Sequence, residues 1–190
     1  MSLFTAARSP LSQVQRLKVL IERLINGTGG RLNSIAILSA HRSQSPHAHN
    51  RKNRQDLEKK LKAIGCGFKR IVGHGQEENG KVVREPSFVV FNISFSQAKD
   101  LWGHYDQWGI IYIGTETKSK PLILGSEPTL TGQHEDVVGE LGSPKIVTPG
   151  QPRPRTWSEI PDKKKPGYGI EMPFIGPGKL PGHTAPPRKK

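Results

Sequence analysis

The chain has 190 residues, of which 33% are hydrophobic, and its formal net charge is +13. The single cysteine, Cys66, excludes an intramolecular disulfide and a zinc site built from several cysteines. The excess of basic residues favours polyanionic partners: nucleic acid, an acidic protein surface or anionic lipid. No apolar run reaches the length of a membrane span, and the first residues lack the pattern of a secretory signal, so we expect no membrane partner.

The first predicted element is a helix over residues 10–25. Ser9 can cap it, Pro10 suits its first turn, and the NGTGG stretch at 26–30 ends it. Its apolar residues recur every three or four positions and form one stripe: Val14, Leu17, Ile21 and Leu24. We expect this stripe to dock on the domain or on a neighbouring subunit. The alternative is a membrane-surface helix, which its modestly basic polar face favours less. Residues 1–30 are therefore assigned to an N-terminal helical extension.

Residues 33–126 carry the pattern of a compact α+β domain. Strands are predicted at 34–40, 68–73, 86–93, 109–115 and 120–126, and helices from a cap at Asn50 to Gly65 and over 96–107. Two strand–helix–strand crossovers then interleave into one antiparallel sheet with both helices on one face. The predicted fold is a ferredoxin-like βαββαβ sandwich. Its other sheet face needs a cover, from another subunit or from the terminal segments.

The remaining chain loses its hydrophobic periodicity. We predict a linker over residues 127–147 and an extended basic arm over 148–190, a region that holds ten of the 16 prolines. We expect partners to order the arm, with Trp157, Tyr168 and Phe174 as anchors. Its basic residues are predicted to contact nucleic-acid phosphates: Lys163, Lys164, Lys165, Arg188, Lys189 and Lys190.

The richest polar stretch is SAHRSQSPHAHN, residues 39–50, between the end of a strand and the next helix. Ligand sites in α/β proteins favour that position. Backbone amides at the helix N-terminus, together with two arginines, can bind a carboxylate or a phosphate. The candidate ligand-binding residues are Ser39, His41, Arg42, Asn50 and Arg54. The alternative is an ordinary polar loop that ends in an asparagine cap.

The sequence predicts neither a metal nor a cofactor. The histidines at positions 41, 47, 49 and 74 do not have the spacing of three or four converging zinc ligands. The glycines of GHGQEENG lack the strand-to-helix context of a dinucleotide site. Loop histidines and a polar turn are therefore the preferred interpretation.

Several short motifs resemble the phage S-adenosylmethionine lyases. They are ILSAHRS, NRKNRQDLEKKL, GFKRIVGHGQE, VREPSFVVF and QAKDLWGHYDQWGIIY, over about residues 35–125. An uncharacterised bacterial family that shares the Glu-x-Ser-Phe stretch fits equally well. The resemblance to the lyases implies a trimer with substrate sites between subunits. There the substrate's own carboxylate attacks, forming homoserine lactone and methylthioadenosine.

The important glutamate of those lyases corresponds to Glu85, which would hold the sulfonium or ribose end of the substrate. Arg42 or Arg54 would orient the substrate carboxylate. The chain departs from the lyases at His41, where an aromatic residue is usual, and at Pro86. Glu85 therefore has two interpretations, a catalytic residue or a paired framework residue.

Two functions remain open, and with them whether the protein is an enzyme. The favoured one is a bacteriophage virion or assembly protein, a structural homo-oligomer in the virion or the host cytoplasm. Its arm would bind neighbouring subunits, other virion proteins or packaged nucleic acid. The alternative is an S-adenosylmethionine lyase. The first is favoured because the predicted arm, residues 148–190, is over a fifth of the chain, and a small lyase needs no arm.

Overall fold

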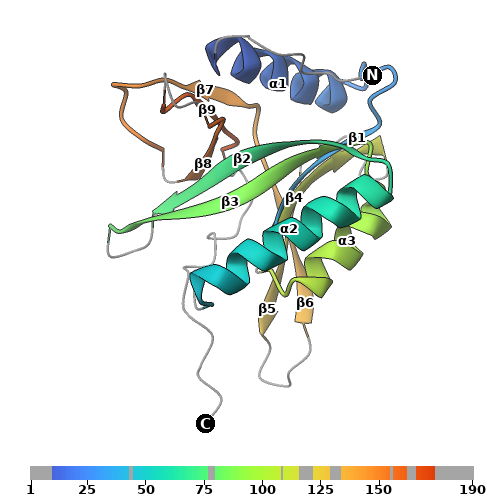
Figure 1. Ribbon diagram of the computed structural model, residues 1–190. Coiled ribbons are helices and arrows are strands. Elements are labelled where there is room, and N and C mark those ends of the chain that lie inside the picture. Colours follow the sequence, from blue (N-terminus) through green and yellow to red (C-terminus); the bar gives the residue numbers. More distant parts are fainter. Residues whose placement is uncertain are drawn as a thin grey trace.

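The computed structural model describes residues 10–42, 45–76, 80–107, 109–115, 122–128, 134–154, 156–161 and 166–173. Within these ranges the chain forms three helices and nine strands (Figure 1). The helices are α1 (Pro10–Ile25), α2 (His47–Ala63) and α3 (Phe95–His104). The strands are β1 (Ser34–Ser39), β2 (Gly67–Gln76), β3 (Val82–Phe91), β4 (Gly109–Gly114), β5 (Leu122–Pro128), β6 (His134–Glu140), β7 (Lys145–Val147), β8 (Thr156–Glu159) and β9 (Gly169–Glu171). The predicted mixture of helices with an antiparallel sheet is confirmed.

The nine strands form one antiparallel sheet in the order β6-β5-β4-β1-β3-β2-β8-β9-β7. The two edge strands, β6 and β7, are consecutive in the chain and separated only by residues 141–144. In a flat sheet, eight strand spacings would place the edges about 38 Å apart. Five residue steps span at most about 18 Å. The sheet must therefore curl, and it wraps around α1 (Figure 1).

The sheet separates two hydrophobic cores. On one face, α2 and α3 cover alternate residues of the central strands, including Leu38, Phe88, Val90 and Tyr112. On the other face, the intervening residues, such as Ile35 and Val89, pack beneath α1.

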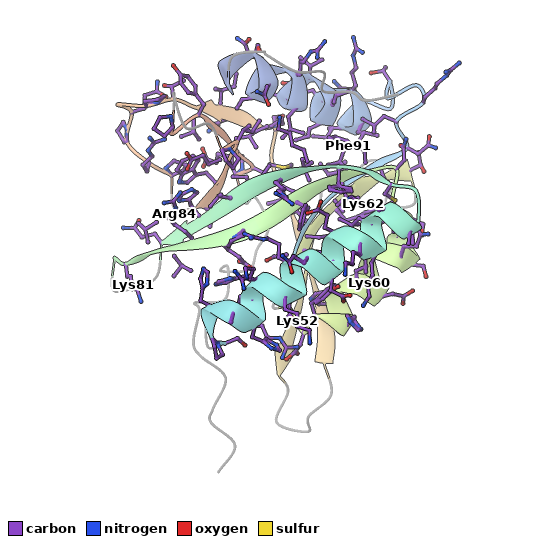
Figure 2. All side chains as sticks on the ribbon, in the orientation of Figure 1. Lys52, Lys60, Lys62, Lys81, Arg84 and Phe91 are labelled. Carbon is purple, nitrogen blue, oxygen red and sulfur yellow. The ribbon has the colours of Figure 1, made fainter. Side chains whose placement is uncertain are left out.

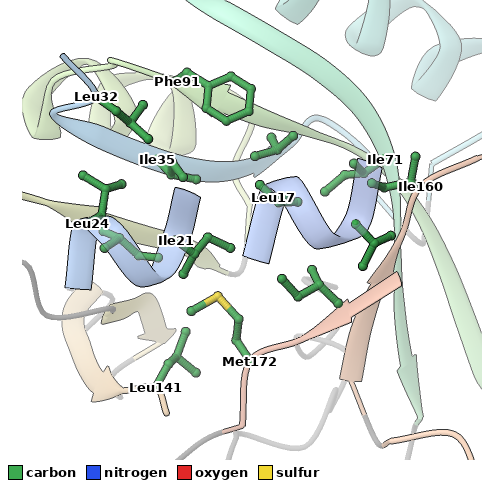
Figure 3. Close-up of a cluster of buried hydrophobic side chains, with 14 residues drawn as sticks. Leu17, Ile21, Leu24, Leu32, Ile35, Ile71, Phe91, Leu141, Ile160 and Met172 are labelled. Carbon is green, nitrogen blue, oxygen red and sulfur yellow. The ribbon is translucent and has the colours of Figure 1, made fainter. Parts of the chain in front are cut away.

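The stripe predicted on α1 packs against its own domain. Val14, Leu17, Ile21 and Leu24 are all buried, and Leu141 and Met172 lie in the same cluster (Figure 3). The face that the two other helices leave open is thus covered by terminal segments, one of the two covers expected. None of the described helices is long and apolar enough to cross a membrane.

The third strand begins earlier than predicted, at Val82, so Pro86 lies inside β3 and pairs with Val72. The carbonyl of Pro86 accepts a hydrogen bond from Ser39 Oγ at 3.1 Å. Because the carbonyl and amide of one strand residue point to the same side, the missing donor of Pro86 faces β1 just where β1 ends. No ladder hydrogen bond is lost there, so a proline inside the strand is tolerated.

The C-terminal region departs from the predicted linker and arm. The predicted linker contains β6 and β7, and the predicted arm contributes β8 and β9. Trp157 is buried in its own domain, and Tyr168 packs against the core beneath α1. The region folds back because it supplies apolar side chains to that core: Ile146, Ile160, Ile170 and Met172. The predicted anchor Phe174 and the predicted phosphate contacts lie outside the described residues: Lys163, Lys164, Lys165, Arg188, Lys189 and Lys190.

Candidate functional site

The predicted ligand loop is fastened to α2 by Asn50. This residue does not cap the helix, which begins at His47 after Pro46 and has no side-chain cap. Instead Asn50, 7% exposed, turns back toward the loop. Its Oδ1 accepts from the Arg42 amide at 2.8 Å, and its Nδ2 donates to the carbonyls of Arg42 at 2.8 Å and Ser45 at 3.2 Å. The predicted cap is wrong because the asparagine satisfies loop groups rather than the first amides of the helix.

Other predicted ligand residues also make internal hydrogen bonds. Arg42 Nε donates to the Tyr105 carbonyl at 2.9 Å, and its guanidinium lies 3.6 Å from Asp106. Ser39 Oγ accepts from the His41 amide at 3.0 Å. The His41 carbonyl accepts from Gln107 Nε2 at 3.0 Å. These contacts give the loop a framework role.

A second polar group joins α2 to the end of α3. Tyr105 donates its hydroxyl to Asp56 at 2.8 Å, and Lys60 lies 3.2 Å from the same carboxylate. The Tyr105 hydrogen bond, with the nearby Lys60 ammonium, lowers the pKa of the Asp56 carboxyl. Burial and the Asp56 contact raise the pKa of Tyr105 above its usual range. A phenol held so firmly in its protonated form is suited to hydrogen bonding and not to proton abstraction.

The sheet keeps Glu85 away from Arg54. In β3, Val89 and Phe91 point toward α1, so Glu85, an even number of residues before them, lies on that face. Arg54 is on α2, which covers the opposite face, and falls between the buried Asn50 and Leu57. One subunit therefore does not bring the predicted glutamate and this arginine together.

The most distinctive charged surface lies along the solvent-facing side of α2, and we did not identify it from the sequence. We define the basic surface as Arg51, Lys52, Lys59 and Lys62, all exposed. Their spacings of one, seven and three residues place them within about 100° of the helix circumference, so they share one side of the helix. This spacing was the signal available in the sequence. Figure 2 shows Lys52, Lys60 and Lys62 along α2.

Of the four residues of the basic surface, only Lys62 is paired with an acidic residue of α2. Glu58 is contacted by two cations, Arg70 of β2 and Lys62 at 3.1 Å. The Arg70 hydrogen bond is the main reason that the pKa of Glu58 is lowered, so this carboxyl stays ionised and paired. Asp56 is engaged by Tyr105 and Lys60. Within the described part of the chain, Arg51, Lys52 and Lys59 make no ion pair.

The fold and the surface define a mixed α/β domain with an antiparallel sheet and a basic helix on one face. The profile of one protein family, described as "Protein of unknown function (DUF3293)", matches residues 41–110. This range begins in the loop before α2 and ends in β4, so it includes the basic surface. It leaves out α1, β1 and β5 to β9. No curated protein matches the chain.

Proposed function

We propose that this protein is a non-enzymatic accessory protein of phage type that binds nucleic acid through the basic surface of α2. The basic surface itself is the observation that carries the proposal. The helix holds six basic and two acidic residues, a net charge of +4 in 17 residues. Both acidic residues are already paired. Exposed cations such as Arg51, Lys52 and Lys59, which pair with no carboxylate in the described part of the chain, attract phosphate groups at any sequence of bases.

The start of α2 adds to the positive electrostatic potential of the basic surface. Its first turn holds no acidic residue, although acidic residues stabilise that end of a helix. Arg51 and Lys52 follow in the second turn, next to the positive N-terminal end of the helix dipole. This arrangement costs stability in the free protein. An anion bound nearby would offset that cost, which supports a polyanionic partner.

The proposal keeps the wider setting expected from the sequence. We propose a homo-oligomer, with a trimer as one form, that works in the virion or the host cytoplasm beside other virion proteins. We also propose that β1 to β4 with α2 and α3 form a ferredoxin-like unit. Their order, β4-β1-β3-β2, with one helix after β1 and one after β3, supports this assignment.

The test is the salt dependence of binding to a DNA duplex of unrelated sequence. Lys52→Glu combined with Lys59→Glu should weaken binding and flatten the plot of log affinity against log salt. The slope should change by about 0.9 for each phosphate that the variant no longer neutralises. The matched control is Arg23→Glu combined with Arg31→Glu, which makes the same charge change at exposed positions on and just after α1. Equally weakened binding in both double variants would show that net charge alone attracts DNA.

The contribution of the basic C-terminus needs a separate variant. Removing residues 174–190 leaves β8, β9 and Met172 in place, whereas a cut after Val147 would remove part of the core. If the predicted phosphate contacts in that region act together with α2, this truncation should flatten the salt plot further. An unchanged slope would assign DNA binding to the folded domain alone.

The S-adenosylmethionine lyase remains the competing hypothesis. It places Glu85 and Arg42 or Arg54 in one site between subunits, and the pairing with Arg54 requires two chains because the sheet separates Glu85 from Arg54 within one chain. Purified protein would then release methylthioadenosine from S-adenosylmethionine, and Glu85→Gln would abolish the product. Product formation by the unmodified protein would overturn the non-enzymatic proposal.

A further inference from the structure

A buried histidine joins strand β8 to the rest of the sheet. Nε2 of His74 of β2 is hydrogen-bonded to the carboxylate of Glu159 of β8 at 2.9 Å. The two side chains are only 8% and 9% exposed. The His74 ring is also stacked on Trp157, with 4.1 Å between ring centroids and 10° between planes. Both partners of His74 therefore belong to β8.

Glu159 is held on several sides. It accepts the Gly167 amide at 2.8 Å, and the Arg84 guanidinium of β3 lies 3.9 Å away. Arg153, from the segment before β8, places its guanidinium 4.6 Å from the centre of the Trp157 ring. The charged groups facing His74 are therefore Glu159 of β8, Arg84 of β3 and Arg153.

These contacts lie at the place where the C-terminal strands attach. By C-terminal strands we mean β7, β8 and β9. In the sheet order they follow β2, and β8 is the strand that pairs with it, through four residue pairs that include His74 with Trp157. On the other face they are held by apolar contacts beneath α1, which do not depend on pH. A change in the charge of His74 thus acts directly on the β2–β8 junction.

We propose that His74 is a proton-sensitive latch that fastens the C-terminal strands to β2 at neutral pH and loosens them on acidification. This inference is independent of the proposed nucleic-acid binding. It assigns the junction a regulatory role that follows from the stacking and burial of one imidazole against β8.

The surroundings of the imidazole explain why docking of the C-terminal strands should weaken, and not strengthen, as the pH falls. Burial lowers the pKa of His74, and the Arg84 and Arg153 charges lower it further, while the Glu159 carboxylate raises it in part. Burial is the largest of these effects, so the docked state favours neutral His74. Above a pH of about 6.5 the undocked imidazole is also neutral, and docking has its full strength. As the pH falls below that value, the undocked histidine binds protons first and docking weakens.

The first measurement is an NMR titration of the His74 imidazole in the full-length protein. Its pKa should lie below about 6.5, the ordinary value for a histidine side chain. The second is hydrogen exchange of residues 156–159, corrected for intrinsic amide chemistry, between about pH 7.5 and about pH 5.5. Exchange should rise severalfold on acidification, since a gap of one pKa unit changes the undocked population by up to about tenfold.

Variants distinguish the effect of His74 protonation from other effects of acid on the protein. His74→Gln keeps a polar side chain near Glu159 but does not titrate, so its exchange should no longer respond to pH. His49→Gln removes an exposed histidine of α2 and should respond as the unmodified protein does. If His74→Gln fails to fold, Glu159→Gln provides the second test, because loss of the carboxylate should lower the pKa of docked His74 further and enlarge the rise in exchange on acidification. A His74 pKa at or above about 6.5, or a pH response retained in His74→Gln, would overturn the proposal.

Discussion

Asn50 and Arg42 are joined by a pair of hydrogen bonds. The asparagine side chain accepts from the backbone amide of Arg42 and donates to its backbone carbonyl. Both distances are 2.8 Å. A backbone segment paired in this way imitates a short piece of sheet, with a side chain in place of a second strand. The loop before α2 is thereby fixed at its start, and its position depends on one amide group.

Replacing Asn50 with aspartate should destabilise the fold. The carboxylate keeps the acceptor for the Arg42 amide, but it loses the donor and faces the carbonyls of Arg42 and Ser45. A buried polar group left without its partner costs about 1–3 kcal/mol. Urea denaturation would measure the loss, with Asn53→Asp on the same helix as the control. Similar midpoints for the two variants would show that this pair of hydrogen bonds contributes little.

Tyr105→Phe should raise the pKa of the Asp56 carboxyl. The phenol hydrogen bond is the main reason that this pKa is lowered, and phenylalanine removes it without changing the shape of the ring. A lowered carboxyl pKa adds stability at neutral pH that is lost as the pH falls below about 4. The variant should therefore lose less stability between neutral and acid pH than the unmodified protein. NMR titration of the Asp56 carboxyl carbon would check the shift, and an unchanged value would contradict it.

Gly103→Ala should stabilise the protein. Gly103 is exposed inside α3, and an added Cβ would meet no atom within 4 Å. Alanine favours a helix interior over glycine by roughly 1 kcal/mol because it restricts the unfolded chain. The midpoint of thermal unfolding should rise by a few degrees. A lower midpoint would mean that the last turn of α3 needs the freedom of glycine.

Gly169→Ala should loosen the C-terminal strands. A Cβ on Gly169 would lie 2.3 Å from the Ser158 carbonyl oxygen and 2.5 Å from the Trp157 ring. One of these groups must move, and overpacking of this kind costs roughly 1–3 kcal/mol. Hydrogen exchange should rise over residues 156–159. The control is Gly67→Ala in β2, whose Cβ would make only an ordinary contact with Phe91 at 3.9 Å. Equal exchange in both variants would rule out tight packing at Gly169.

Elements with local signals could be read from the sequence. The first helix has its predicted bounds because its stripe, its early proline and its terminal glycines all act within a few residues. The capping box of Ser94 and Gln97 was equally readable, and it explains why α3 starts at Phe95 rather than one residue later. Asn50 misled the assignment because side-chain capping cannot be told from a bond back to a loop without the fold.

The C-terminal strands could not be predicted from their own residues. Val147, Trp157 and Ile170 are separated by prolines, glycines and charges, so no window of sequence shows strand alternation. Their stability comes from partners far away in the chain, such as His74 for Trp157. The candidate ligand site stays a prediction, for a different reason. Its polar residues were found correctly, but only the structure shows that they bond to one another.

Because the sheet closes around α1, burial of this helix must wait until the C-terminal strands have been synthesised. The apolar stripe of α1 is synthesised first, yet it packs against β7 and β9, which are among the last described elements of the chain. Until those strands leave the ribosome, one side of α1 lacks its cover. Contacts between distant parts of a chain form slowly, and apolar surface that waits for them invites aggregation. The nascent protein should therefore depend on chaperones more than its size suggests, and C-terminal truncations within β8 or β9 should accumulate as insoluble chains.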